Sequence, residues 1–203
     1  MPAPSIKGTA FQSVAADLQK LIDAGRIPRN LLEARLRPED RRLLESPVLP
    51  GQWVPLASYE RLVELLLRTE GAGQPDYLVR RGARAAERLF AAGLYLQLER
   101  GEAIGAQKRE LGERWTATEG NLLASLSGAI FSVSSWRFRV DPEEASLFYI
   151  DVSEAEALPE VSRLSAQGFI EYAASRIAGR PMQVTSERPE RDRIRFTLRR
   201  SKR

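Results

Sequence analysis

The alternation of hydrophobic and polar residues is clearest in the last third of the chain, where it predicts an ordered series of elements. Apolar residues alternate with arginine in Trp136–Val140, which is typical of a half-buried β-strand. A second apolar run follows at 147–152, and a helical pattern begins at Pro159. Alternation returns at 182–184 and 194–198. The pattern therefore predicts a β-hairpin, a long helix and a second β-hairpin.

Helical spacing dominates the first two thirds of the chain. Apolar residues recur every three to four positions in four segments: 6–25, 58–67, 75–94 and 121–133. Ser58 is the expected N-cap of the second segment, and Pro38 is the expected start of one of two short helices between residues 27 and 49. Residues 99–118 are polar, and the pattern leaves open whether they form a helix or a mobile lid over a pocket.

These elements predict an α+β fold, because the strands form short antiparallel pairs and the helices are separate from them in the sequence. The expected architecture is a helical shell packed on a small antiparallel sheet made of two hairpins. The turn signal Pro50-Gly51 divides the chain into an N-terminal helical arm, residues 1–50, and a single α+β domain that binds a ligand or a partner, residues 51–203.

The chain contains no Cys and no His, which removes several classes of function. Thiol nucleophiles, Ser-His triads, His-ligated haem and Cys/His zinc sites each need one of these residues. For the cluster of Ser132, Ser134 and Ser135 there is no His and no Ser-x-x-Lys arrangement to supply a base, and there is no Gly-rich phosphate loop or calcium-binding loop. We therefore expect no catalytic residue, no metal and no cofactor, and a protein that is not an enzyme.

Two features of the sequence concern the location of the protein. The first residues, Met1–Gly8, lack the apolar stretch that is typical of a signal peptide. No segment of the chain reaches the length of apolar sequence that a membrane-spanning helix needs. We therefore expect a cytoplasmic protein.

The protein is basic, with a formal net charge of +4, and its basic residues are almost all arginine. Only four of the 31 basic residues are lysine, namely Lys7, Lys20, Lys108 and Lys202. A GC-rich genome produces such a bias without a functional cause, and we favour that explanation. The alternative is a surface for phosphates or acidic partners, because the planar guanidinium group matches these anions better than an ammonium group does.

The alternating strands place arginine on one side of the predicted sheet. If the two hairpins pair, their outward positions form a candidate face for an anion or a partner, made of Arg137, Arg139, Arg193, Arg195 and Arg199. Guanidinium groups crowded in this way suggest phosphate, nucleic acid or an acidic protein surface. We favour a solvated face neutralised by Glu187, Glu190 and Asp192, since no aromatic residue alternates with the arginines to stack on bases.

A second basic candidate lies on the predicted helix 75–94. Arg80, Arg84 and Arg88 are four residues apart and share one helical stripe. The stripe is either a docking surface for an acidic partner or an ordinary exposed helix face, and the exposed face is the simpler explanation.

The order of elements in the C-terminal part, with a long helix ending in Ala178-Gly179-Arg180-Pro181, resembles the 4-vinyl reductase domain and the superfamily of haem-NO-binding domains and TRAPP subunits that shares its fold. The opening Ile6-Lys7-Gly8 and the segment Trp53-Val54-Pro55-Leu56, followed by Tyr59 and Leu62, are similar to an uncharacterised myxobacterial family of this fold. The resemblance covers residues 50–200 well and the first 50 residues loosely.

This resemblance implies a helical shell around an apolar pocket that binds a small hydrophobic molecule or a partner protein. The candidate pocket residues are aromatic: Trp53, Tyr59, Phe90, Tyr95, Trp115, Phe131, Phe169 and Tyr172. The alternative is that they form ordinary core. The chain departs from these families because it lacks the proximal His of haem-NO-binding domains and the Cys residues of the 4-vinyl reductase domain.

The leading hypothesis is a non-enzymatic binding module with a regulatory or signalling role. The resemblance to the families named above implies a homodimer. It would bind a small apolar ligand or a partner protein. One alternative is a nucleic-acid-associated protein that uses the arginine face. Another is a structural subunit of a larger complex, which would leave helix faces such as the stripe of Leu62, Leu66 and Phe90 uncovered.

Overall fold

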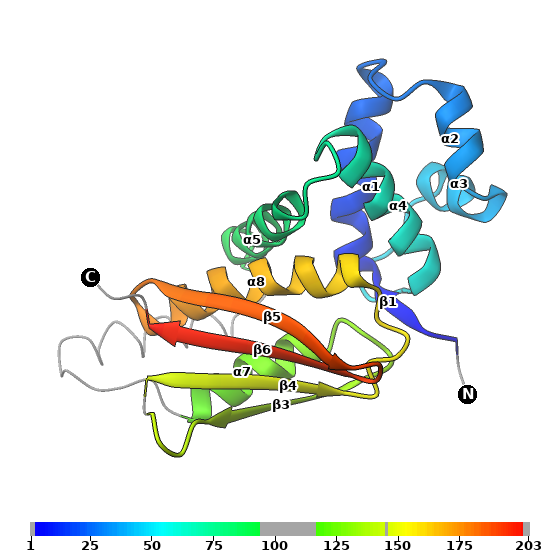
Figure 1. The fold of residues 1–203 in the computed structure, drawn as a ribbon. Coiled ribbons are helices and arrows are strands. Elements are labelled where there is room, and N and C mark those ends of the chain that lie inside the picture. Colours follow the sequence, from blue (N-terminus) through cyan, green and yellow to red (C-terminus); the bar gives the residue numbers. More distant parts are fainter. Residues whose placement is uncertain (1–2, 94–116, 145, 201–203) are drawn as a thin grey trace. The chain divides into compact units, whose positions relative to one another are not determined.

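The predicted α+β fold class is confirmed by the computed structural model, which describes residues 3–93, 117–144 and 146–200 (Figure 1). These residues form seven helices, a two-stranded antiparallel sheet and a four-stranded antiparallel sheet. The two-stranded sheet was not predicted.

The chain divides into two compact units, which are described separately. The first unit holds Met1–Leu78 and Ile130–Val133, and the second holds Val79–Ala129 and Ser134–Arg203. The boundary expected near residue 50 separates a helical arm from an α+β domain that binds a ligand or a partner, and this functional division is not tested by the two compact units. It therefore stays a prediction.

The first unit is mainly helical. Its strands are β1 (Ser5–Lys7) and β2 (Trp53–Pro55), and the helices that lie wholly within it are α1 (Gly8–Asp23), α2 (Arg29–Arg35), α3 (Pro38–Glu45) and α4 (Leu56–Thr69). The two short helices predicted between residues 27 and 49 are confirmed, and Pro38 begins the second. The apolar stripes of α1 and α4 face each other, and Val14, Leu18, Leu62 and Leu66 are fully buried.

Helix α4 begins before Ser58, and the prediction that Ser58 is its N-cap is wrong. The pairing of β1 with β2 decides where the helix starts, because the backbone N–H of Leu56 donates to the carbonyl of Pro4 at 2.9 Å directly after β2. Pro55 is the N-cap residue, and Ser58 lies buried inside the helix. A strand pairing between distant segments thus outweighed the local capping preference of serine.

The predicted helix 121–133 also ends early. The observed helix, α7, spans Ala117–Gly128, and the next residues pair with β1. The N–H of Lys7 donates to the carbonyl of Ile130 at 2.9 Å, and the N–H of Ser132 donates to the carbonyl of Ser5 at 3.0 Å. These bonds hold residues 130–133 in the first unit, although their apolar spacing would continue a helix. Most of the segment 99–118, which was expected to be either a helix or a mobile lid, lies outside the described residues.

The second unit is built on the four-stranded sheet. Its elements are α5 (Asp76–Ala91, which begins in the first unit), α7, β3 (Ser135–Val140), β4 (Leu147–Ser153), α8 (Glu160–Ala178), β5 (Met182–Glu190) and β6 (Arg193–Arg200). The strand order is β3-β4-β6-β5, all antiparallel. Both predicted hairpins are therefore present, and the β4–β6 pairing joins them into one sheet.

Helices α7 and α8 pack on one face of this sheet, with α7 against β3 and α8 along β5 (Figure 1). Most of the strand residues that face these helices are apolar, and Phe138, Ile150 and Phe196 are buried among them. A glycine allows α7 to come close, since a Cβ on Gly120 would lie 2.3 Å from the ring of Phe138. The alternate residues of each strand face the other way, and apart from Leu147 they are exposed or half-buried.

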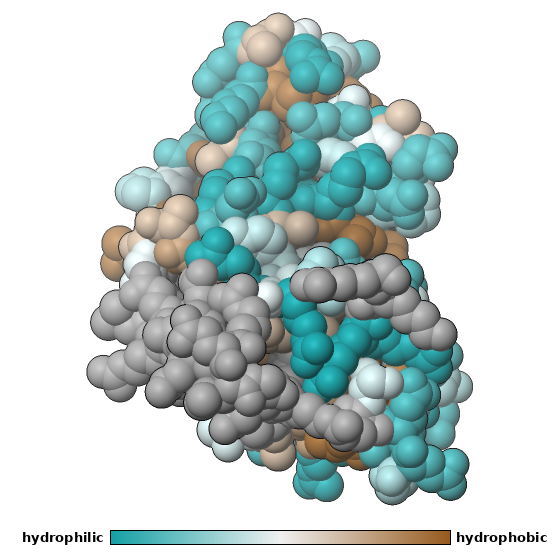
Figure 2. Space-filling model, turned by 90° about the vertical axis from the view of Figure 1, so that its left-hand side faces the viewer, coloured by the Kyte–Doolittle hydropathy of each residue, from teal (hydrophilic) through white to brown (hydrophobic). Residues whose placement is uncertain are grey.

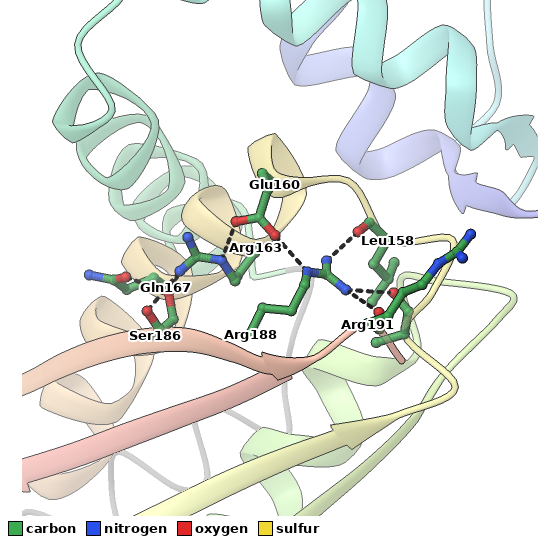
Figure 3. A network of polar contacts seen from close by, with 8 residues as sticks. Leu158, Glu160, Arg163, Gln167, Ser186, Arg188 and Arg191 are labelled. Carbon is green, nitrogen blue, oxygen red and sulfur yellow. Dashed lines mark hydrogen bonds and ion pairs between the residues drawn. The ribbon is translucent and has the colours of Figure 1, made fainter. Parts of the chain in front are cut away.

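Strand β5 is an edge strand, and side chains of α8 satisfy the backbone groups on its free side. Four residues on one stripe of α8 reach it: Arg163, Gln167, Glu171 and Ser175. The N–H of Val184 donates to Glu171 at 3.0 Å, and Gln167 donates to the carbonyl of Val184, also at 3.0 Å. Arg163 donates to the carbonyl of Ser186 (Figure 3). Because unpaired edge groups invite another strand, this arrangement closes β5 to strand addition.

Replacing Glu171 by alanine should lower the free energy of unfolding by about 1–3 kcal/mol, because the N–H of Val184 would lose its acceptor in a buried position. The variant Glu171→Gln keeps an acceptor oxygen and should retain most of the stability. Urea denaturation of both variants measures the difference. If the alanine variant is as stable as the original protein, the side-chain closure of β5 is not needed for stability.

On the face shown in Figure 2, hydrophilic residues occupy most of the coloured surface, and the hydrophobic patches between them are small. The stripe of Leu62, Leu66 and Phe90 is buried, which is not what a structural subunit with uncovered helix faces was expected to show. Among the described helices, none is both long enough and apolar enough to cross a membrane.

Candidate anion-binding groove on the sheet

A groove of about 330 Å³ lies on the outer face of the four-stranded sheet, formed by β3, β4 and β6 and by Pro189 near the end of β5. Its charged lining residues are Arg137, Arg139, Asp151, Arg193 and Arg195. Four of the five arginines predicted to share a face therefore line one groove, and Arg199 is outside it. Four guanidinium groups and one carboxylate give the lining an excess of positive charge.

The strand register explains why these residues meet. Arg137 on β3 is opposite Asp151 on β4, and Asp151 is in turn opposite Arg195 on β6. One step along the strands, Ser135 is opposite Ser153. The groove forms because β4 presents the short side chain of Ser153 between two strands that carry long arginine side chains.

Asp151 lies at the centre of the charged row and binds two of the arginines. Its two carboxylate oxygens accept hydrogen bonds from Nε of Arg195 and Nε of Arg139, both at 2.7 Å. Burial raises the pKa of Asp151, but the hydrogen bonds from Arg195 and Arg139 outweigh this effect and hold the pKa below its ordinary value. Asp151 is therefore ionised at neutral pH, and it fixes the positions of Arg139 and Arg195.

The other two arginines of the groove, Arg137 and Arg193, have weaker interactions with acidic side chains. Arg137 is exposed and forms no ion pair with the residues that the structure describes. Arg193 approaches Glu190 at 3.5 Å, and both side chains are about 60% exposed, at 60% and 59%. An ion pair with this exposure contributes little to stability, so a bound anion can compete for Arg193. The expected neutralisation by glutamate is therefore only partial.

The expectation that no aromatic residue lies among the arginines is wrong. Tyr149 is opposite Arg139 in the register, on the same outer face as Asp151. The guanidinium carbon of Arg139 lies 4.2 Å from the centre of the Tyr149 ring, and that of Arg195 lies 5.4 Å away. Tyr149 also donates its O–H to Asp141 at 3.1 Å. The sequence pattern did not reveal Tyr149, because β4 is apolar on both sides apart from Asp151. Without alternation, the residues of β4 that face outward could not be recognised.

Two further arginines, not singled out by the sequence pattern, stabilise the second unit. Arg188 donates to Glu160 and to the backbone carbonyls of Ala155, Leu158 and Arg191 (Figure 3). Arg163 donates to Glu160 at 2.6 Å and to Ser186. Burial raises the pKa of Glu160, and the hydrogen bonds from Arg188 and Arg163 lower it below its ordinary value. These arginines connect β5, α8 and the loop before α8. Their role is structural.

The second basic candidate lies elsewhere. Arg80, Arg84 and Arg88 are exposed on α5, as predicted for one helical stripe. They are not part of the groove on the sheet. Their use as a docking stripe stays a prediction.

The aromatic candidates for an apolar pocket are divided between the two units. Trp53, Tyr59 and Phe131 belong to the first unit, and Phe90, Phe169 and Tyr172 belong to the second. Trp53 is 46% exposed, whereas Tyr59, Phe90 and Phe169 are buried. Phe90 and Tyr172 contact each other edge-to-face, with ring centres 5.8 Å apart. Tyr95 and Trp115 lie outside the described residues.

The chemistry of the described residues offers little for catalysis. They contain no group of three acidic side chains that is placed to hold a metal ion. Burial and the charge of Glu64 raise the pKa of Glu60, but Glu60 lies on α4 in the first unit. In the groove, the one carboxyl group, Asp151, has a lowered pKa and does not act as a proton donor at neutral pH. The arrangement is suited to holding an anion.

The fold is similar to that of H-NOX proteins of known structure. An Fe(II) unliganded H-NOX protein from K. algicida is 9% identical in sequence, with a TM-score of 0.58 over 98% of both chains. A point mutant of the K. algicida protein is 10% identical, with a TM-score of 0.60 over 97% of both chains. A variant of Tt H-NOX is 13% identical, with a TM-score of 0.54 over 97% of this chain and 96% of that one. No protein-family model matches the sequence, and no curated protein does.

The similarity to H-NOX proteins raises the question of whether this chain binds haem. The side chains that could serve as axial ligands to haem iron do not fit that role. There is no His and no Cys to supply an axial imidazole or thiolate. Three of the described tyrosines have other contacts: Tyr77 donates to Glu70, Tyr149 donates to Asp141, and Tyr172 packs against Phe90. Met182 is buried in β5. The expected relation to haem-NO-binding domains is thus confirmed for the fold, and at these identities the likeness shows the fold alone.

Proposed function

We propose that this protein is a non-enzymatic regulatory module that binds an anionic ligand or partner in the groove on the outer face of its four-stranded sheet. The observation that carries the proposal is the lining of four arginines and one aspartate. A groove with an excess of guanidinium groups attracts anions by charge and holds them through forked N–H donors.

The distribution of ion pairs supports an open binding surface. Asp151 engages Arg139 and Arg195, whereas Arg137 has no carboxylate among the described residues and Arg193 has only an exposed one. The two less committed guanidinium groups are therefore available to a ligand without breaking a buried interaction.

Nucleic acid is the second candidate for the same surface, favoured by Tyr149 among the arginines. Aromatic side chains on an open antiparallel sheet stack on unpaired bases in several RNA-binding folds. In this protein Arg139 lies over the Tyr149 ring, so the ring is not simply exposed for stacking. We therefore place a nucleic-acid partner after an acidic or phosphorylated one.

Several finer expectations remain proposals. They are the relation to the 4-vinyl reductase domain, to TRAPP subunits and to the myxobacterial family, a homodimer, a cytoplasmic location, and a small apolar ligand bound by the aromatic candidates. Native mass spectrometry of the purified protein tests the dimer and the apolar ligand together. Extra mass that is lost on denaturation would identify a bound ligand.

The groove is tested with a polyanion that carries no phosphate. A fluorescein-labelled peptide of ten glutamates should bind at low salt, and its affinity should fall as salt is added. The double variant Arg137→Glu with Arg193→Glu should weaken this binding about tenfold or more, because it reverses both uncommitted charges. Fluorescence anisotropy measures the dissociation constants.

A matched control separates the groove from net charge. The double variant Arg29→Glu with Arg80→Glu changes the total charge equally but at exposed sites on α2 and α5. It should bind the peptide almost as the original protein does. An equal loss in both double variants would contradict the proposal, because binding would then follow net charge. A labelled single-stranded oligonucleotide in the same assay tests the nucleic-acid alternative.

A further inference from the structure

We infer that one end of the groove is a subsite for the phosphoryl group of a small phosphate monoester, held between Arg137 and Arg193 above Ser135 and Ser153. This inference rests on the proposed anion-binding function and specifies the ligand class. The four side chains come from three adjacent strands, β3, β4 and β6, and all line the same groove.

The geometry of the sheet brings these side chains together. Neighbouring strands lie about 4.8 Å apart, so β3 and β6 are separated by roughly 10 Å with β4 between them. Ser135 and Ser153 are directly opposite each other, and both are exposed. Ser153 on β4 therefore lies between the strands that carry Arg137 and Arg193, and Ser135 lies two residues before Arg137 on β3.

The charge distribution assigns the ligand to this end of the groove. Asp151, two residues from Ser153 on β4, accepts hydrogen bonds from Arg139 and Arg195 and offsets part of their charge. Arg137 is opposite Asp151 in the register, but both carboxylate oxygens are already bonded to the other two arginines. Arg137 and Arg193 are thus the two groove arginines with no hydrogen bond to Asp151, so a ligand does not compete with that carboxylate for them.

The donors match a phosphoryl group better than a carboxylate. A phosphate monoester presents three acceptor oxygens and about two negative charges at neutral pH. Two guanidinium forks and two hydroxyl groups can supply donors to all three oxygens, whereas a carboxylate has only two oxygens and one charge. The volume of about 330 Å³ is near the lower end of the range for small-molecule sites, which favours a small ligand over a polymer.

The experiment compares two probes of nearly equal shape, phenyl phosphate and phenyl sulfate, by isothermal titration of the full chain at low salt. Phenyl phosphate should bind about tenfold more tightly at pH 7.5, because phenyl sulfate carries one charge fewer. Its affinity should fall between about pH 7.5 and about pH 5, as the phosphate takes up a proton with a pKa near 6. The affinity of phenyl sulfate should change little over that range.

Variants locate the subsite. Arg137→Gln with Arg193→Gln should weaken phenyl phosphate binding about tenfold or more, and Ser153→Ala should weaken it several-fold. The control is Arg199→Gln, which removes an exposed arginine of the same sheet outside the groove and should leave binding unchanged. Backbone amide shifts of Ser135 and Ser153 on titration report the position of the ligand and confirm that each variant is folded.

The possible results separate this inference from the proposed function. Equal binding of the two probes, or phosphate binding that survives loss of both arginines, overturns the phosphate subsite. The anion-binding function still stands in that case if the glutamate peptide requires Arg137 and Arg193. Binding of an oligonucleotide without binding of phenyl phosphate replaces the small ligand with a nucleic acid. If none of the anions binds, both the subsite and the proposed function are wrong.

Discussion

Replacing Gly168 by alanine is expected to destabilise the protein by about 3 kcal/mol, and to lower its melting temperature by on the order of 10 °C. Gly168 lies on α8, where a Cβ would come within 1.8 Å of the carbonyl oxygen of Val79 on α5. Gly82 on α5 meets α8 in the same way, since a Cβ there would lie 1.9 Å from the carbonyl oxygen of Ser165. Both conflicts are with backbone atoms, so the two helices must move apart to relieve them.

The direction of the effect distinguishes packing from helix propensity. In an exposed helix the change from glycine to alanine gains about 1 kcal/mol. A loss of stability for Gly168→Ala therefore shows that the contact between α5 and α8 outweighs propensity. Gly51→Ala is the control, because a Cβ at Gly51 meets no atom within 4 Å. Thermal unfolding measures all three proteins, and a stabilised Gly168→Ala variant would contradict the close packing of α5 on α8.

Replacing Asp40 by asparagine should cost about 3 kcal/mol of stability, the lower part of the range for breaking a buried ion pair. Asp40 on α3 is 0% exposed and accepts two hydrogen bonds from Arg61 on α4, at 2.6 and 2.7 Å. It also accepts from the backbone N–H of Arg37. Asparagine has a similar shape but no charge, so Arg61 would keep its charge at 20% exposure with only the more distant Glu39, at 3.7 Å, as an acidic partner. Urea denaturation at neutral pH measures the loss.

The same pair should make stability depend on acid pH. Burial raises the pKa of Asp40, but the hydrogen bonds from Arg61, Ser58 and the backbone of Arg37 outweigh it and lower the pKa below its ordinary value. A carboxyl group with a lowered pKa stabilises the folded state above its unfolded pKa of about 3.9, and the stabilisation is lost as the pH falls through the folded pKa. The Asp40→Asn variant should therefore lose less stability on acidification than the original protein.

An exposed pair provides the control for Asp40. Arg29 and Glu33 form an ion pair on α2 with side chains 91% and 48% exposed. The variant Glu33→Gln should change stability by less than about 0.5 kcal/mol. If Asp40→Asn has an equally small effect, the contact between α3 and α4 does not depend on the ion pair.

The arginine face shows how far a sequence pattern can predict a candidate site. Alternation with apolar residues is enough to predict that Arg137 and Arg139 share one side of a strand, and likewise Arg193 and Arg195. The pairing of β4 with β6 brings the two sets together, and this pairing joins segments more than forty residues apart. Tyr149 and Ser153 could not be placed, because a strand that is apolar on both sides gives no alternation to read.

Element boundaries were least predictable where distant backbone segments pair. The helix stripes and the turn at 141–144 depend on local spacing and local hydrogen bonds: Asp141 accepts from the N–H groups of Glu143 and Glu144. The start of α4 and the end of α7 depend instead on β1, which pairs with β2 and meets Phe131. At these two boundaries local propensity was therefore overridden by hydrogen bonds that β1 supplied from elsewhere in the chain.

The sequence by itself determined the class of fold, the two hairpins around a long helix, and the absence of the residues needed for thiol, imidazole or zinc chemistry. These properties follow from residue type and from periods of two and 3.6, which are local. Only the tertiary structure decided that four arginines line one groove, that Asp151 binds two of them, and that two serines line the same groove. The physical reason is strand register. Which side chains meet across a sheet depends on backbone pairing between distant segments, and the local pattern of residues does not specify that pairing.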